Sequence, residues 1–254
     1  MSAKPDLAVV VTFHREGLLA PSTLGSIARA LEKLREAGFS YEAIFTLDRA
    51  DDLTRGIVEN WNGIEARILS LDVGDLARAR NVATSQARGQ FIAFMDGDDL
   101  YMSTWLSEAM KLATVTPGRF VWRPETILSF ERYGMIWRPV ELKKSEAALG
   151  LSTQTLWPVC CVIERTLAAA IPYPPLDNEF PFEDWAWNIA LVEAGVTNRI
   201  VPRTGYGYRV KRRGSLLAAS LAWPKHRRPT KFFRRLLEAR IGCKAAALTR
   251  ASPN

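Results

Sequence analysis

The first hundred residues alternate between short apolar runs and segments in which apolar residues recur at helical spacing. Such a pattern predicts strands separated by helices. The predicted strands are residues 7–11, 41–47, 67–71 and 91–95. The predicted helices are residues 22–38, 57–61 and 76–88. Strands that alternate with helices favour right-handed crossovers, so we expect an α/β fold with a mixed, mainly parallel sheet flanked by helices.

The pattern changes after residue 100 and indicates an α+β arrangement for the second half. A helix is expected at residues 103–113 and another from Glu183 to about Ala194. Strands are expected at residues 120–122, 126–130 and 135–140. Four prolines, at positions 172, 174, 175 and 181, frame the segment before Glu183. We interpret this segment as a loop that forms a wall or lid over a site.

Charge separates the chain into a nearly neutral body and a basic tail. The 254 residues carry a net charge of +7, and residues 225–254, with nine Lys or Arg and one Glu, account for +8. The chain is long enough for one domain with an appendage. We assign residues 1–222 to the domain and residues 223–254 to a basic, amphipathic, helical tail.

The tail has apolar residues at helical spacing among its basic ones, including Trp223, Phe232 and Ile241. One interpretation is peripheral contact of residues 223–250 with an anionic membrane surface. The other is a helix that packs on the domain and exposes a basic face. Nucleic acid is not an expected partner, because the body contains no recognised nucleic-acid motif.

Cysteine usage and the N-terminus predict where the protein resides. Cys160 and Cys161 are adjacent and the third cysteine is Cys243, so we expect no disulfide framework and a reducing compartment. The polar start leads directly into a first strand, without the features of a signal peptide. No stretch reaches the roughly 18 apolar residues of a membrane span. The expected location is cytoplasmic, with any membrane contact at the inner face.

Three carboxylates crowd into one loop, Asp96-Gly97-Asp98-Asp99, directly after the fourth predicted strand. Clustered like charges repel each other, and oxygen ligands of this kind suit Mg²⁺ or Mn²⁺. The alternative is a solvated acidic turn before the helix at Ser103. Thr12 and Asp48 also fall at the carboxyl ends of predicted strands, where ligands of parallel sheets bind.

Four segments in a fixed order resemble family 2 glycosyltransferases, over about residues 7–217. Residues 79–81, 87–89 and 91–99 resemble the run that leads into the family's DXD motif, and residues 9–15 resemble its opening strand and nucleotide-binding turn. Phe182-Glu183-Asp184-Trp185 is similar to the later Glu-Asp motif. Tyr208-Arg209 with Gly214-Ser215 is similar to the segment that closes the catalytic domain.

The resemblance implies a GT-A fold with a nucleotide-binding half, residues 1–100, and an acceptor-binding half, residues 101–222. It implies that a nucleotide donor is held near the strand ends, with Asp98 or Asp99 coordinating Mn²⁺ or Mg²⁺. Asp184, next to Glu183, is implied as the general base of an inverting displacement. The implied nucleotide contacts are Thr12, Phe13, Asp48, Arg80 and Asp96.

The chain departs from the family pattern at two places. Arg49 follows Asp48 where relatives often have a second Asp, so the resemblance does not identify the nucleobase of the donor. Lys211 and Arg212 occupy a stretch where many relatives have a His that completes the metal site. A lysine there could neutralise a diphosphate directly, which would weaken the dependence on metal.

The expected function is therefore transfer of a sugar, with a UDP-sugar as the expected donor, to a glycan, lipid-linked or protein-bound acceptor. Bacterial surface polysaccharide synthesis is the setting that the resemblance implies. The alternative is a non-catalytic carbohydrate-binding or assembly protein on a transferase scaffold. A sugar-nucleotide synthesising enzyme is disfavoured, because residues 12–17 do not form a Gly-rich, Arg-bearing loop. With only two histidines, His14 and His226, a His-rich metal site is also disfavoured.

Overall fold

The computed structural model describes residues 4–175, 182–211, 232 and 235. Its first half contains four strands joined by helices, in the predicted order. The strands are β1 (Leu7–Phe13), β2 (Tyr41–Asp48), β3 (Ala66–Leu71) and β4 (Phe91–Asp96). The connections are a short 3-10 turn η1 (Gly17–Leu19), α1 (Ala20–Glu36), α2 (Asp52–Glu59) and α3 (Leu76–Gln86). All four strands are parallel, so the α/β prediction for this half is confirmed.

The second half is less regular, as its sequence pattern indicates. Its strands are β5 (Leu100–Tyr101), β6 (Phe120–Glu131), β7 (Met135–Trp137), β8 (Cys161–Glu164) and β9 (Thr197–Val210). Its helices are α4 (Trp105–Ala113), α5 (Lys144–Leu151), α6 (Arg165–Ala170) and α7 (Glu183–Glu193). Parallel and antiparallel pairs are mixed here, because β8 runs antiparallel to both β4 and β6 whereas β9 runs parallel to β6.

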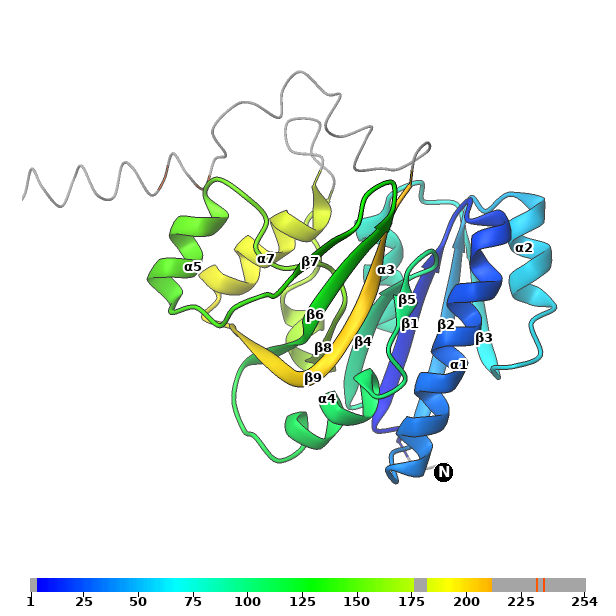
Figure 1. Cartoon of the computed structure of the whole chain (residues 1–254), viewed down its shortest axis with the longest axis horizontal. Helices are drawn as coiled ribbons and strands as arrows, with labels where there is room; N and C mark the ends of the chain where they lie inside the picture. The colour runs from blue at the N-terminus through cyan, green and yellow to red at the C-terminus, as the bar shows by residue number, and fades with distance from the viewer. Residues whose placement is uncertain (1–3, 176–181, 212–231, 233–234, 236–254) are drawn as a thin grey trace, which may run out of the picture.

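The strands of the described residues form one continuous sheet, in the order β3-β2-β1-β4-β8-β6-β9-β5, with β7 paired to β6 (Figure 1). β8 joins the parallel first half to the mixed second half. The parallel register aligns Thr12 with Asp96, so the carboxyl ends of β1 and β4 meet at one edge of the sheet. The expected mixed sheet flanked by helices is confirmed.

Several predicted boundaries were wrong in the second half. The strands expected at residues 120–122 and 126–130 are one strand, β6, with a register shift between Pro124 and Thr126. The strand expected at residues 135–140 ends at Trp137. Five elements, β5, β8, β9, α5 and α6, were not predicted. β5, β8 and α6 are very short, and α5 contains an internal Gly150, so none of them has a long periodic pattern.

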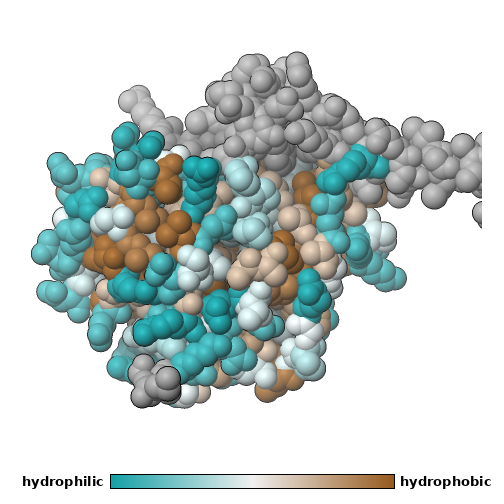
Figure 2. Space-filling view, turned by 180° about the vertical axis from the view of Figure 1, so that it is seen from behind, coloured by the Kyte–Doolittle hydropathy of each residue, from teal (hydrophilic) through white to brown (hydrophobic). Residues whose placement is uncertain are grey.

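Apolar side chains from the two faces of the sheet pack into two large cores. On β1 all residues are buried, with Val9 and Val11 on the side of α1 and α4 and Val10 on the side of α3, α6 and α7. A strand buried on both faces is typical of a parallel sheet covered by helices. Seen from behind, hydrophilic side chains line much of the periphery and hydrophobic ones gather in patches between them (Figure 2).

A smaller core lies between α5 and α7 and includes one residue of the tail. Phe232 is buried there with Trp157 and Ile189, and Arg235 forms an ion pair with Glu193 at 2.8 Å. At these two residues the tail packs on the domain, and the rest of it lies outside the described residues. Cys160 and Cys161 are buried free thiols. None of the helices in the described residues is long and apolar enough to cross a membrane.

Candidate functional site

The edge where β1 and β4 end brings Thr12 against Asp96. The Thr12 hydroxyl donates to Asp96 Oδ1 at 3.2 Å, and the Gly97 amide donates to the Thr12 carbonyl at 3.0 Å. A Cβ at Gly97 would lie 2.4 Å from the Phe13 ring and 2.8 Å from the Thr12 carbonyl oxygen. Only glycine therefore lets the acidic loop cross this closely over the end of β1.

The side chain of Phe13 belongs to the core rather than to the open edge. It is buried and meets the Phe45 ring edge-on, with 5.6 Å between ring centroids. Phe13 was predicted to contact a nucleotide, and with its side chain buried only its main chain can do so. The prediction rested on the position of Phe13 in the turn, but alternation along β1 places Phe13 on the same covered face as Val9 and Val11.

Asp48, at the end of β2, holds the loop that leads into α3. Its Oδ1 accepts hydrogen bonds from the amides of Val73 and Gly74 at 2.9 and 3.1 Å, and its Oδ2 accepts one from Asp75 at 3.2 Å. His14 Nδ1 lies 2.6 Å from the Asp48 carbonyl oxygen. The predicted nucleotide contact of Asp48 thus falls at a position that also fixes the adjoining loop.

Arg80, on the inner face of α3, joins the acidic loop to the start of α7. Its two terminal nitrogens lie 2.7 Å from Asp96 Oδ1 and 3.1 Å from Glu183 Oε1. The side chain is 1% exposed, so the guanidinium lies inside the fold and not in solvent. Burial opposes its charge, yet Asp96 and Glu183 together raise the pKa of Arg80.

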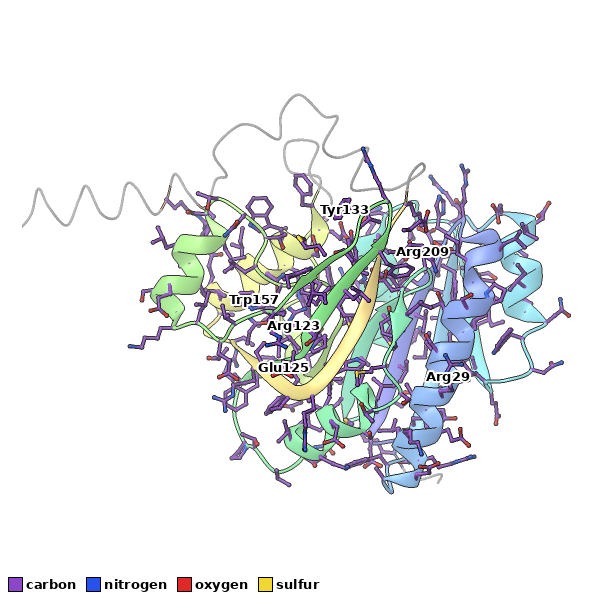
Figure 3. All side chains as sticks on the ribbon, in the orientation of Figure 1. Arg29, Arg123, Glu125, Tyr133, Trp157 and Arg209 are labelled. Carbon is purple, nitrogen blue, oxygen red and sulfur yellow. The ribbon has the colours of Figure 1, made fainter. Side chains whose placement is uncertain are left out.

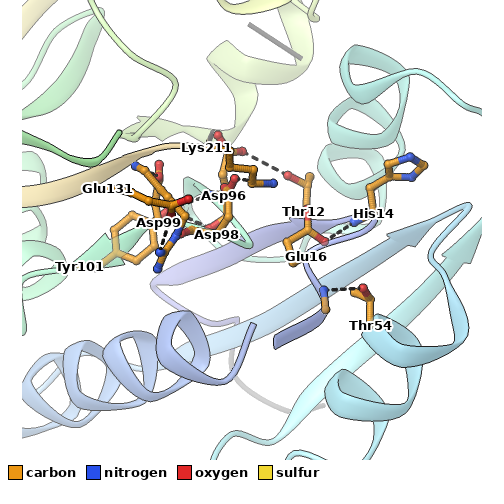
Figure 4. Close-up of polar contacts among 12 residues, drawn as sticks. Thr12, His14, Glu16, Thr54, Asp96, Asp98, Asp99, Tyr101, Glu131 and Lys211 are labelled. Atoms are coloured by element: carbon orange, nitrogen blue, oxygen red, sulfur yellow. Dashed lines mark hydrogen bonds and ion pairs between the residues drawn. The ribbon is translucent and has the colours of Figure 1, made fainter. Parts of the chain in front are cut away.

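Asp98 and Asp99 are held by residues at the end of β9 (Figure 4). Asp98 Oδ2 pairs with Lys211 Nζ at 2.8 Å, and Asp99 Oδ1 accepts a hydrogen bond from the Arg209 amide at 2.8 Å. The Arg209 guanidinium donates to the Asp98 carbonyl oxygen at 2.7 Å and pairs with Glu131 at 3.0 Å. Burial raises the pKa of both carboxyl groups, and that of Asp99 lies well above its usual value.

The fit of this loop to a divalent cation can be judged from its donor atoms. Asp99 Oδ2 is buried and has no hydrogen-bond partner. An unpartnered buried carboxylate oxygen is a ligand that Mg²⁺ and Mn²⁺ accept. Across the described part of the chain, however, no three His, Cys, Asp or Glu side chains are grouped as a metal site. The donor atoms fit a hard cation, but one of the carboxylates, that of Asp98, is already paired with Lys211.

Asp184 lies in the first turn of α7, directly after the residue that Arg80 holds. Its Oδ1 accepts a hydrogen bond from the Trp185 amide at 2.7 Å. Burial, with the charge of Glu183 as the next contribution, raises the pKa of Asp184 to about 7. Trp187 is 1% exposed and stacks on Tyr173, with ring centroids 4.2 Å apart, so it is a core residue.

Three site residues were not identified from the sequence pattern. The Tyr101 hydroxyl accepts from the Asp96 amide at 2.7 Å and donates to the Asp96 carbonyl at 3.0 Å, which pins the end of β4. Glu16 accepts a hydrogen bond from the His14 amide at 2.5 Å, and its pKa is raised, chiefly by burial. Arg209 was noted only within the closing segment; Figure 3 places it at the end of the sheet where Tyr133 lies.

The structure therefore brings most of the predicted residues to one edge. Direct contacts link Thr12, Asp96, Arg80 and Glu183, and Asp98 and Asp99 follow in the same loop. Asp184 is adjacent through Glu183, and Asp48 lies on the neighbouring strand. Gly214 and Ser215 of the closing segment lie outside the described residues.

Comparison with known proteins places this geometry in a family. A crystal structure of S. aureus TarS 1–349 in complex with UDP-GlcNAc has a TM-score of 0.62 and 19% identity, covering 84% of this chain and 61% of that chain. The same TarS segment with UDP also has a TM-score of 0.62, at 18% identity over 81% of this chain and 61% of that chain.

A longer S. aureus TarS structure has a TM-score of 0.60 and 20% identity, covering 81% of this chain and 37% of that chain. The chain thus spans less than two thirds of the TarS chains that it matches. Among curated proteins, none matches the chain. The model of the family described as glycosyl transferase family 2 matches residues 8–171, which is more than half of the chain. With the shared GT-A fold, this match shows that the chain belongs to glycosyltransferase family 2.

Proposed function

We propose that the protein transfers a sugar from a nucleotide-sugar donor, with a UDP-sugar as the preferred donor, to an acceptor hydroxyl with inversion. The observation that carries the proposal is the Arg80 bridge, in which one buried guanidinium contacts both Asp96 and Glu183. The acidic loop is thereby tied to Glu183, the residue next to the candidate base Asp184. Two similar TarS structures are complexes with UDP-GlcNAc and with UDP, which supports the choice of donor.

The nucleoside is assigned to the ends of β1, β2 and β4. Thr12, Asp48 and Asp96 offer oxygen atoms that can accept hydrogen bonds from the hydroxyls of a ribose or the N–H of a base. Phe13 would contribute through its main chain. Arg80 orients the Asp96 carboxylate, so its contribution to donor binding runs through Asp96.

The diphosphate is assigned to the acidic loop, with Mn²⁺ or Mg²⁺ held by Asp98 and Asp99. The unpartnered Asp99 Oδ2 supports this assignment. When bound, the metal would stabilise the negative charge that develops on the leaving diphosphate. Lys211 pairs with Asp98 and offers a second positive charge to the diphosphate.

Asp184 is assigned as the general base, and Glu183 as the residue that positions it through Arg80. In its ionised form Asp184 would accept the proton of the acceptor hydroxyl while that oxygen attacks the anomeric carbon. The bond from this carbon to the diphosphate oxygen breaks on the opposite face, so one displacement inverts the anomeric centre. A pKa of about 7 leaves Asp184 partly ionised at neutral pH.

The acceptor is proposed to be a carbohydrate, a glycolipid or a protein-bound glycan, bound by residues 101–222 opposite the nucleotide-binding half of residues 1–100. A cytoplasmic location with peripheral membrane contact through residues 223–250 accompanies this proposal. Most of that segment lies outside the described residues, so its support is the +8 charge of residues 225–254.

A non-catalytic carbohydrate-binding protein on the same scaffold is the second candidate. The observation that favours it is the ion pair of Lys211 with Asp98, which neutralises a carboxylate that a metal would use. Both candidates can bind a glycan, but only the transferase needs a metal-dependent nucleotide site.

The first prediction concerns donor binding and is tested by calorimetric titration of UDP and GDP, with Mn²⁺ and then with EDTA. We expect UDP to bind more tightly with Mn²⁺, and the double variant Asp98→Ala, Asp99→Ala to lose the effect of the metal. Asp72→Ala, a change at an exposed aspartate, is the matched control. Binding of neither nucleotide would reject the transferase in favour of the second candidate.

A further inference from the structure

Lys211 forms a largely buried ion pair with the loop assigned to the diphosphate. Its Nζ lies 2.8 Å from Asp98 Oδ2, and the side chains of Lys211 and Asp98 are only 18% and 21% exposed. Lys211 directly follows Val210, the last residue of β9, which is paired in the sheet with Glu131. The ammonium is therefore placed by the sheet, not by a flexible surface segment.

The surroundings of Lys211 are strongly acidic. The charges of Asp98, Glu16 and Asp96 all raise its pKa, against the opposing effect of burial. The nearby arginines are engaged elsewhere, because Arg80 bridges Asp96 and Glu183 and Arg209 pairs with Glu131. Lys211 is thus the counter-ion of Asp98.

A divalent metal and this ammonium cannot share Asp98 at low energetic cost. The metal needs the carboxylate oxygen that Lys211 occupies, and two cations at hydrogen-bond distance repel each other. Next to it, the buried Asp99 Oδ2 has no hydrogen-bond partner and is of the donor type that a divalent metal accepts. If Lys211 left Asp98 without a new partner, a largely buried ammonium would be stranded, which is costly.

We propose that Lys211 is a resident counter-ion that a divalent metal displaces from Asp98 and that then pairs with the donor diphosphate. This inference rests on the proposed function, because it requires a nucleoside diphosphate at this edge. Displacement from Asp98 would free the Lys211 ammonium to pair with the diphosphate. The diphosphate in turn would draw the ammonium away from Asp98 and leave that carboxylate to the metal. Metal and nucleotide consequently bind with positive coupling, and this coupling is reciprocal.

The test measures the two ligands separately and together in the full chain. Mn²⁺ binding without nucleotide is followed by the paramagnetic resonance of free Mn²⁺, and UDP binding is followed by calorimetry in EDTA and at saturating Mn²⁺. The variants are Lys211→Met, which removes the charge, and Lys211→Arg, which keeps it. The matched control is Lys111→Met, which breaks a 2.8 Å ion pair with Glu108 on the exposed face of α4.

We expect Lys211→Met to bind Mn²⁺ alone about tenfold more tightly than the wild type and to bind UDP in EDTA about tenfold more weakly, within the usual range of coupling between two sites. UDP should then change the affinity for Mn²⁺ much less than in the wild type. Lys211→Arg and Lys111→Met should retain the wild-type coupling.

An unchanged Mn²⁺ affinity in a folded Lys211→Met protein would overturn the inference, whereas the proposed function would stand if UDP still binds with Mn²⁺. Failure of the wild type to bind UDP would instead reject the proposed function and this inference together. If Lys211→Met unfolds, Lys211→Gln replaces it, with the thermal midpoint as the check of folding. A weaker rather than tighter binding of Mn²⁺ by either variant would also contradict displacement.

Discussion

The four aspartates of the site have different surroundings, although three of them belong to one loop. Asp96 receives hydrogen bonds from Thr12 and Arg80, whereas Asp98 pairs with Lys211. Asp99 keeps one oxygen without a partner, and the pKa of Asp184 is raised to about 7. Carboxylates whose environments separate their proton affinities are suited to different roles in one reaction.

The pH dependence of transfer should report Asp184. Because the base must be ionised, we expect the rate of sugar transfer to rise with pH and to level off above a midpoint near 7. Asp184→Asn should lower the rate by at least about 100-fold, the usual contribution of a general base. The measurement is the pH profile of UDP release with a competent acceptor. A wild-type profile that is flat over about 3 pH units centred on this midpoint would contradict the assignment.

The same group should also affect the free energy of unfolding. The pKa of Asp184 is higher in the folded chain than its ordinary value of 3.8, so between these values the unfolded chain binds fewer protons. Stability from this group is therefore present at low pH and is lost as pH rises toward 7, by up to about 4 kcal/mol for a shift of this size. Asp184→Asn should reduce this loss, as measured by urea unfolding at both ends of the range. Asp72→Asn, at an exposed site, should leave it unchanged.

At the scale of elements, β9 supplies the residues that the acidic loop needs. It carries Tyr206, which stacks on Tyr101, and Arg209, which holds both Asp98 and Asp99. The strand was not predicted because Pro202, Gly205 and Gly207 interrupt its apolar pattern. Gly205 is required by packing, since a Cβ there would lie 2.8 Å from the Thr126 carbonyl oxygen. β9 is thus defined by its partner β6 and not by its own periodicity.

The predictable and unpredictable parts of the site differ in the same way. Local patterns identified β1, β2 and β4 and the carboxylates at their ends, because a buried strand followed by acidic residues is visible within a short window. The Arg80 bridge could not be found this way, since Arg80 and Glu183 are 103 residues apart in the chain. Tyr101 was missed because a single tyrosine after the loop carries no local signal.

The second half depends on a buried arginine that links three of its elements. Arg123 on β6 is fully buried and lies near Trp157 (Figure 3). It donates to Asn198 on β9 at 2.9 Å, to Asn188 on α7 at 2.6 Å, and to the carbonyls of Pro158 and Val159.

Arg123→Ala should therefore destabilise the fold strongly. The change leaves buried amide and carbonyl groups without donors and opens a cavity, with an expected loss of about 3–5 kcal/mol. Urea unfolding followed by tryptophan fluorescence measures it. Arg132→Ala, at an exposed position after β6, should change the free energy of unfolding by less than about 0.5 kcal/mol. Equal effects of the two substitutions would show that the buried network does not stabilise this half.

At the scale of the whole molecule, charge and packing are distributed unequally. The body is nearly neutral, whereas residues 225–254 carry +8. Phe232 packs into the core between α5 and α7, and Arg235 pairs with the side chain of Glu193. Packing on the domain and contact with a membrane are therefore compatible, because the packing described here involves only Phe232 and Arg235 and not the other basic residues.

Binding to lipid vesicles tests the membrane contact. Replacing Lys225, Arg227, Arg228 and Lys231 by Gln should weaken the free energy of binding to anionic vesicles by about 1 kcal/mol per charge. Sedimentation with anionic vesicles should therefore fall sharply, and sedimentation with neutral vesicles should not change. The wild-type binding should weaken as salt is added. A control with the same number of exposed charges removed from the helices α1 and α4, at Arg29, Lys33, Arg35 and Lys111, should bind nearly as the wild type. Equal losses in both proteins would reject a specific role of the tail.

The long separation between the acidic loop and β9 also has a consequence for synthesis on the ribosome. A nascent chain that has emerged as far as Asp96 already contains the four parallel strands, which pair with one another. Asp99 meets its partner Arg209 only after a further 110 residues, and Lys211 follows it. Domains generally begin to fold from the N-terminal side as they emerge. The nucleotide-binding edge is thus built early. Asp96 already has Arg80 as its partner, whereas Asp98 and Asp99 stay without theirs until the end of β9 has been made.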